Sequence, residues 1–180
     1  MSKRNGQDIS RREFGSSLGA IAAGVVAGAE LLTPASVGAA PLVGSRVLGA
    51  NDTIRVAVCG INGRGGSHIG ELSEIPNVQV THLVDPDSRL FESRRKEITD
   101  RTGQTPICVQ DVREVLEGDS VDAISIATCN HWHALMAIWA CQAGKDVYVE
   151  KPLSHNVFEG RQLVAAAKKY GRVVQHGTQQ

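Results

Sequence analysis

From residue 54 to the C-terminus, short apolar runs alternate with longer and more polar segments. Short runs rich in Val, Ile and Ala are typical of buried strands, and the segments between them have the length of helices. The predicted strands are Ile54–Cys59, Val78–Val84, Pro106–Val109, Asp122–Ala127, Asp146–Val149 and Arg172–Gln175. The predicted helices are Ser67–Ile75, Asp87–Thr102, Val112–Glu117, His131–Ala143 and Asn156–Tyr170.

Strands that are separated by helices predict a parallel sheet with right-handed crossovers. The nearly continuous apolar character of these strands indicates a sheet that is covered on both faces. We therefore expect an α/β domain with a doubly wound parallel sheet over residues 53–180.

The charge balance and the cysteines exclude several functions. The 180 residues carry 19 Lys and Arg against 19 Asp and Glu, so the formal net charge is zero. This balance argues against a nucleic-acid partner. No pair of the four cysteines has C-x-x-C spacing, which argues against a zinc site. We expect the four cysteines to be small buried side chains. A disulfide between two of them is the alternative if the protein is exported, because disulfides form outside the cytoplasm.

The N-terminal 40 residues have the order of a signal peptide rather than of a folded domain. The twin arginine Arg11-Arg12 precedes an uncharged run from Phe14 to Ala29, and a small-residue run ends at Ala40. This order predicts a Tat-type signal over residues 1–40, followed by a linker over residues 41–52. The uncharged run is too short for a stable membrane span. We expect export by the Tat machinery to a periplasmic or extracytoplasmic location, with the protein already folded.

A glycine-rich loop follows the first predicted strand and precedes the first predicted helix. It reads Gly60-Ile61-Asn62-Gly63-Arg64-Gly65, so Asn62 stands at the second glycine position of the G-x-G-x-x-G pattern. Such a loop makes a tight turn and directs helix N–H groups at the pyrophosphate of a dinucleotide. The strand and helix on either side are the context that this pattern requires.

An acidic residue ends the second predicted strand. Asp85 follows Gly60 at a spacing near that of a ribose-binding carboxylate. A carboxylate there would accept hydrogen bonds from the ribose hydroxyls, which favours NAD. Arg64 and Arg89 leave NADP possible, and a turn before Pro86 is the structural alternative for Asp85.

Two further loops leave the ends of predicted strands. One reads Thr128-Cys129-Asn130-His131-Trp132-His133 and the other Glu150-Lys151-Pro152. Ligands of open α/β sheets bind at the carboxyl ends of strands, so we expect both loops to face the cofactor. The two histidines lack a nearby acid, and we predict no metal site. One histidine is expected to cap the helix that follows, with the other near the cofactor.

These loops, together with the glycine loop and Asp85, resemble those of the Gfo/Idh/MocA oxidoreductases over about residues 52–180. The resemblance implies a Rossmann-type domain, with Lys151 beside the nicotinamide and the substrate. The histidine of the family's Thr-Pro-x-x-x-His pattern corresponds to His133, and Cys129 stands where the family usually has proline. We predict Lys151 and His133 as catalytic residues. The predicted cofactor-binding residues are Gly60, Asn62, Gly63, Arg64, Gly65, Asp85, Thr128, Asn130, His131, Glu150 and Lys151.

The resemblance also implies a function. We expect hydride transfer between NAD or NADP and a sugar, cyclitol or polyol, with Lys151 able to polarise or deprotonate a hydroxyl of the substrate. The alternatives are an NAD-dependent glycosidase of the same family and a non-catalytic dinucleotide-binding fragment. Family members carry a second, substrate-binding domain after the sixth strand, and we expect it to be absent from this chain. The full-length protein is expected to form a homo-oligomer.

Overall fold

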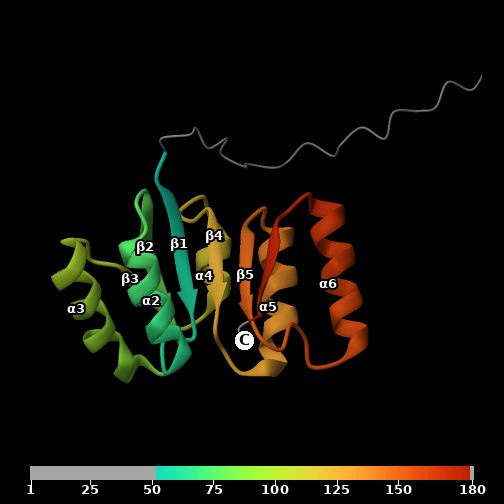
Figure 1. The fold of residues 1–180 in the computed structure, drawn as a ribbon, viewed down its shortest axis with the longest axis horizontal. Coiled ribbons are helices and arrows are strands. Elements are labelled where there is room, and N and C mark those ends of the chain that lie inside the picture. The colour runs from blue at the N-terminus through green and yellow to red at the C-terminus, as the bar shows by residue number, and fades with distance from the viewer. Residues whose placement is uncertain (1–51, 179–180) are drawn as a thin grey trace, which may run out of the picture. The chain divides into compact units, whose positions relative to one another are not determined.

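The computed structural model describes residues 52–178, and within that range six strands form one parallel sheet (Figure 1). The strands are β1 Ile54–Cys59, β2 Val78–Val84, β3 Ile107–Val109, β4 Ala123–Ile126, β5 Asp146–Glu150 and β6 Val174–Gly177. Their order is β3-β2-β1-β4-β5-β6, and every neighbouring pair is parallel. The predicted doubly wound α/β fold is confirmed, and its topological switch point lies between β1 and β4.

Helices connect the strands in the expected alternation. They are α2 Arg64–Glu74, α3 Phe91–Thr102, α4 Val112–Leu116, α5 Asn130–Gln142 and α6 Val157–Tyr170. Local signals set several of their ends. Asn156 caps α6 by accepting a hydrogen bond from the backbone N–H of Glu159, and Gly171 ends the same helix at φ 61°.

Two apolar clusters cover the two faces of the sheet. Side chains alternate between the faces along each strand, so Val58 packs with Ile69 of α2 and Ile98 of α3. Its neighbours Ala57 and Cys59 pack in the other cluster with side chains of α4, α5 and α6. The sheet is therefore held between α2 and α3 on one side and α4, α5 and α6 on the other, which fixes the edge at which the strands end.

The predicted boundaries differ from the structure at the functional edge. Helix α2 begins at Arg64 rather than Ser67, because the poor helix propensity of Gly65 and Gly66 concealed its first turn. The predicted helix 87–102 is divided into a short 3₁₀ turn, η1 (Ser88–Leu90), and α3. Strand β5 continues through Glu150, and β6 begins at Val174 rather than Arg172.

The predicted signal peptide and linker lie outside the described residues. Among residues 52–178, no helix has both the length and the apolar character that crossing a membrane requires. All four cysteines are free thiols. Cys59 and Cys141 are buried as predicted, whereas the expectation of burial is wrong for Cys129, which is exposed at the start of α5.

Candidate functional site

The glycine loop approaches the neighbouring backbone too closely for side chains. Gly60 adopts φ +79°, and a Cβ there would lie 2.7 Å from the carbonyl oxygen of Ala127. A Cβ on Gly65 would lie 1.7 Å from the carbonyl oxygen of Gly60. Glycine at these two positions therefore lets α2 start directly against the end of β1 and against the loop after β4.

Side chains from two other elements fix the glycine loop. The backbone N–H of Ile61 donates to Asp85 Oδ2 at 3.0 Å, and Arg94 Nε donates to the carbonyl oxygen of Ile61 at 2.9 Å. The second oxygen of Asp85, Oδ1, accepts from the backbone N–H of Asp87 at 2.9 Å. Asp85 is 8% exposed. It thus anchors both the loop and the turn after β2, and each carboxylate oxygen retains a lone pair that can accept a further hydrogen bond.

Two helix N-termini at this edge carry neither a capping side chain nor an acidic residue in the first turn. Helix α2 begins after Gly63 and α5 after Cys129, and neither helix has a side-chain cap or an acidic residue in its first turn. The first turns of α3, α4 and α6 each contain a glutamate. Because helix N-termini favour anions, the ends of α2 and α5 suit a negatively charged ligand. The expectation that a histidine caps α5 is wrong, since His131 lies within its first turn and is exposed.

A cavity of about 750 Å³ opens at the ends of β1, β2, β3 and β4. Its floor is the glycine loop, and one wall is the apolar side of α5. The lining residues are Gly60, Asn62, Gly63, Asp85, Pro86, Gln110, Asp111, Val112, Arg113, Ala127, Thr128, Cys129, Trp132, Met136 and Trp139. The structure therefore brings Gly60, Asn62, Gly63, Asp85 and Thr128 together around one space. Gly65 is buried and does not line it.

Sequence reasoning missed the α5 wall of the cavity. Trp132, Met136 and Trp139 are spaced four and three residues apart, which places them on one face of the helix. The rings of Trp132 and Trp139 lie 6.3 Å apart and are tilted by 50°. The chain contains two tryptophans, and both line this cavity. That coincidence of composition and helical spacing is the signal that could have identified the wall.

Arg113 and Asp111 form an ion pair at the rim of the cavity. Both side chains line it, and Asp111 also caps α4 through the backbone N–H of Arg113. The pKa of Asp111 is lowered to about 2, first by its side-chain hydrogen bond with Arg113 and then by the backbone bond. Asp111 is therefore ionised at neutral pH, and the pair presents both charges to the cavity.

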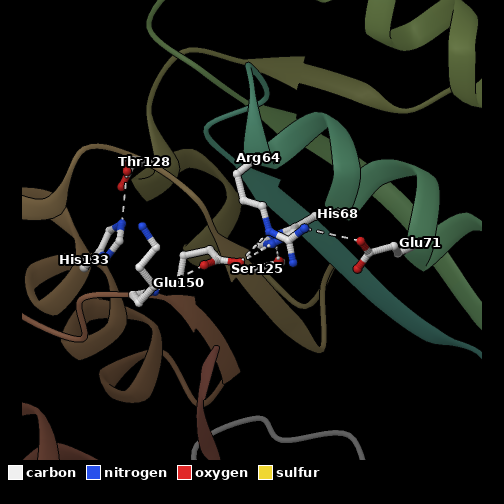
Figure 2. A network of polar contacts seen from close by, with 8 residues as sticks. Arg64, His68, Glu71, Ser125, Thr128, His133 and Glu150 are labelled. Carbon is white, nitrogen blue, oxygen red and sulfur yellow. Dashed lines mark hydrogen bonds and ion pairs between the residues drawn. The ribbon is translucent and has the colours of Figure 1, made fainter. Parts of the chain in front are cut away.

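The Glu150–Lys151–Pro152 step does not line the cavity, and two other predicted residues, Arg64 and His133, contact this step. Glu150 is buried and accepts a hydrogen bond from Arg64 Nε at 2.7 Å (Figure 2). Lys151 is exposed, and a cis peptide bond joins it to Pro152. Asn130 is exposed at the first position of α5.

His133 is buried between the two strand-end loops. One ring nitrogen, Nδ1, lies 2.7 Å from the carbonyl oxygen of Pro152. The other, Nε2, lies 3.0 Å from the carbonyl oxygen of Thr128, as Figure 2 shows. Both nitrogens lie within hydrogen-bond distance of backbone oxygens, and since a carbonyl only accepts, a ring with one N–H donates to one of the two. This geometry gives His133 a role in holding the two loops together, and the catalytic role predicted from the sequence stays a prediction. Within residues 52–178, no three His, Cys, Asp or Glu side chains are grouped as a metal site would require.

Comparison with known proteins places this geometry in a family. Residues 54–178 match the family described as "Oxidoreductase family, NAD-binding Rossmann fold" (GFO_IDH_MocA). The chain is 29% identical over 172 residues to an alpha-N-acetylgalactosaminidase of Shewanella oneidensis, with 90% of this chain and 38% of that protein covered. The chain thus spans 38% of the length of the curated relatives that it matches first.

Two solved structures share the fold. GenD2 from gentamicin A biosynthesis, in complex with NAD, is 32% identical with a TM-score of 0.62, covering 73% of this chain and 36% of GenD2. KijD10, a 3-ketoreductase from Actinomadura kijaniata in complex with NADP and TDP-benzene, is 30% identical with a TM-score of 0.59. It covers 70% of this chain, which in turn covers 37% of KijD10. One complex contains NAD and the other NADP, and the two proteins are similarly identical in sequence to this chain.

Proposed function

Because this chain belongs to the Gfo/Idh/MocA oxidoreductase family, in the NAD-binding Rossmann domain, we propose that it binds NAD at the glycine-loop cavity. The observation that carries the proposal is the convergence of the uncapped α2 N-terminus, Asp85 and Thr128 on one cavity. Three strand ends supply these groups, which is where open α/β sheets bind ligands. We further propose that the whole protein uses NAD to exchange hydride with a sugar, cyclitol or polyol.

The residues present fit the parts of a dinucleotide. The α2 N-terminus would hold the pyrophosphate, because Gly60 and Gly63 leave its approach free of side chains. Asp85 would accept hydrogen bonds from the adenosine ribose. The apolar face around Trp132 and Met136 would cover the adenine, since an aromatic side chain offers a flat surface for stacking.

The chemistry would take place beside the cavity, at Lys151. When bound, NAD supplies the hydride acceptor or donor. The exposed ammonium of Lys151 can donate a hydrogen bond to a substrate oxygen and stabilise negative charge as it develops there. His133 holds the loop of Lys151 against the loop of Thr128, so it contributes through position rather than by proton transfer.

A carboxylate at position 85 favours NAD over NADP, because it would repel a 2′-phosphate. Calorimetric titration of the 180-residue chain with each dinucleotide tests this preference. Replacing Asp85 with Asn should weaken NAD binding by about 10- to 100-fold, the range expected for one lost hydrogen bond to a charged group. Asp100→Asn is the matched control, because Asp100 is exposed on α3 and pairs with Lys96. Tighter binding of NADP than of NAD by the unmodified chain would refute the preference.

An NAD-dependent glycosidase is the second candidate, supported by the likeness to the alpha-N-acetylgalactosaminidase of Shewanella oneidensis. The two activities differ in what accumulates. An oxidoreductase produces NADH when given NAD and a free sugar or polyol, whereas the glycosidase releases the aglycone of an aryl α-N-acetylgalactosaminide without net NADH. The assay should use the full-length protein. If the protein binds a dinucleotide but forms neither NADH nor free aglycone, the third hypothesis, a non-catalytic binding module, is supported.

Export by the Tat route remains part of the proposal. It rests on Arg11 and Arg12 and on the uncharged run that follows them. Replacing both arginines with lysine keeps the charge and should retain the protein in the cytoplasm, as measured by fractionation. Unchanged export of that variant would contradict the proposal.

A further inference from the structure

A buried polar network joins the start of α2 to the end of β5 (Figure 2). Glu150 Oε1 accepts from Arg64 Nε at 2.7 Å and lies 2.9 Å from His68 Nε2. The other ring nitrogen of His68, Nδ1, lies 2.8 Å from Ser125 Oγ on β4. His68 is 3% exposed and Glu150 is 4% exposed. Elements α2 and β5 therefore meet at one carboxylate, and His68 connects them to β4.

The carboxylate of Glu150 can only accept, so the Nε2–H of His68 donates to it. Nδ1 of His68 bonds the hydroxyl of Ser125, which can act as donor or acceptor. The guanidinium of Arg64 balances the charge of Glu150, which would otherwise be costly to bury. His68 therefore links the carboxylate to Ser125 and holds it in one position relative to the sheet.

The position of Glu150 bears directly on Lys151. The backbone N–H of Lys151 donates to Glu150 Oε2 at 3.2 Å, so the carboxylate also contacts the residue that follows it. On the far side of Lys151, the carbonyl oxygen of Pro152 is held by His133. Lys151 thus lies between two residues that are each anchored by a buried histidine, one from α2 and one from α5.

We propose that His68 is a positioning residue for Lys151 and acts through Glu150. The role rests on the proposed function, since it assumes that Lys151 works beside bound NAD. His68 does not line the cavity, and it lies one helical turn after Arg64, at the end of α2 that would receive the pyrophosphate. The same helix therefore ties the phosphate-binding loop to the backbone that carries Lys151.

The test measures how fast the amine of Lys151 reacts with an acylating reagent in the 180-residue chain. Peptide mass spectrometry reports the rate, and exposed Lys168 on α6 serves as the internal standard. In His68→Leu, the ratio of the Lys151 rate to the Lys168 rate should change about tenfold, as expected when a buried charged group loses one hydrogen bond. His68→Gln keeps a donor toward Glu150 and should restore the ratio to within about threefold of the unmodified chain.

Two further variants separate positioning from general damage to the core. His82→Gln is the matched control, because His82 is also a buried imidazole but contacts Thr81 on β2. It should leave the ratio unchanged. Ser125→Ala removes only the hydroxyl at the far end of His68, so it should shift the ratio in the same direction by a smaller factor. It also replaces His68→Leu if that variant does not fold.

Repeating the labelling of Lys151 in the presence of NAD distinguishes this inference from the proposed function. Saturating NAD should protect Lys151 in the unmodified chain, and His68→Leu should lose this protection while its dissociation constant for NAD stays within about threefold. If the unmodified chain does not bind NAD, the proposed function fails, and the ratio measured without NAD still decides the role of His68. An unchanged ratio in both His68→Leu and Ser125→Ala, or an equal shift in His82→Gln, would overturn the inference.

Discussion

Replacing Gly65 with Ala should be one of the most damaging small changes in this domain. The new Cβ would lie 1.7 Å from the carbonyl oxygen of Gly60 and 2.7 Å from its carbonyl carbon. The start of α2 would have to retreat by about 1.7 Å to restore an ordinary contact of 3.4 Å. Both obstructing atoms are backbone, so no side-chain rotation can relieve the overlap.

The expected loss of stability follows from two opposing contributions. Overpacking of a tight site costs about 1–3 kcal/mol, and a backbone obstruction belongs at the upper end of that range. Alanine recovers about 1 kcal/mol through its better helix propensity. We expect a net loss of about 2 kcal/mol in the free energy of unfolding, measured by urea denaturation. NAD affinity should fall about a hundredfold, because the N–H groups of α2 move away from the pyrophosphate.

Gly70→Ala is the matched control on the same helix. Its Cβ would meet only the Arg101 guanidinium at 3.6 Å, which is an ordinary contact. This variant should gain up to about 1 kcal/mol of stability and retain NAD binding. Both substitutions add the same methyl group, and they should change the free energy of unfolding in opposite directions. Equal stabilities, or tight NAD binding by Gly65→Ala, would refute the argument that close approach of α2 to β1 creates the site.

Two other predictions follow from groups with shifted pKa values. The pKa of His82 is lowered, first by burial and then by the charge of Arg55, so the folded chain binds fewer protons than the unfolded chain. Stability should therefore fall as the pH drops below the ordinary value of 6.5, and His82→Gln should flatten this dependence in urea denaturation between about pH 7 and pH 5. Burial raises the pKa of the Cys59 thiol to about 12, so a thiol reagent should modify exposed Cys129 in the native chain and reach Cys59 only on unfolding. NAD should slow the reaction of Cys129, which lines the cavity; equal rates for the two thiols in the native chain would contradict the burial argument.

The sequence alone determined the architecture because the fold depends on local periodicity. The apolar run at Ile54–Cys59 and the glycine stop at Gly171 each carry their structural meaning within a few neighbouring residues. The glycine loop could be recognised for the same reason, since its strand, turn and helix are contiguous. The start of α2 was misplaced because Gly65 and Gly66 have low helix propensity. Only packing against β1 shows why glycine is required at position 65.

Tertiary structure decided which residues meet across the strand ends. The separation between Arg64 and Glu150 is 86 positions and that between His68 and Ser125 is 57, so no local pattern could pair them. His133 was predicted as a catalytic group from its place in a motif, whereas its contacts with two carbonyl oxygens became visible only when both loops were folded. Periodicity determines which face of an element is buried, but the order of strands in the sheet determines which side chains share a site. That order arises from long-range packing, which the sequence does not display residue by residue.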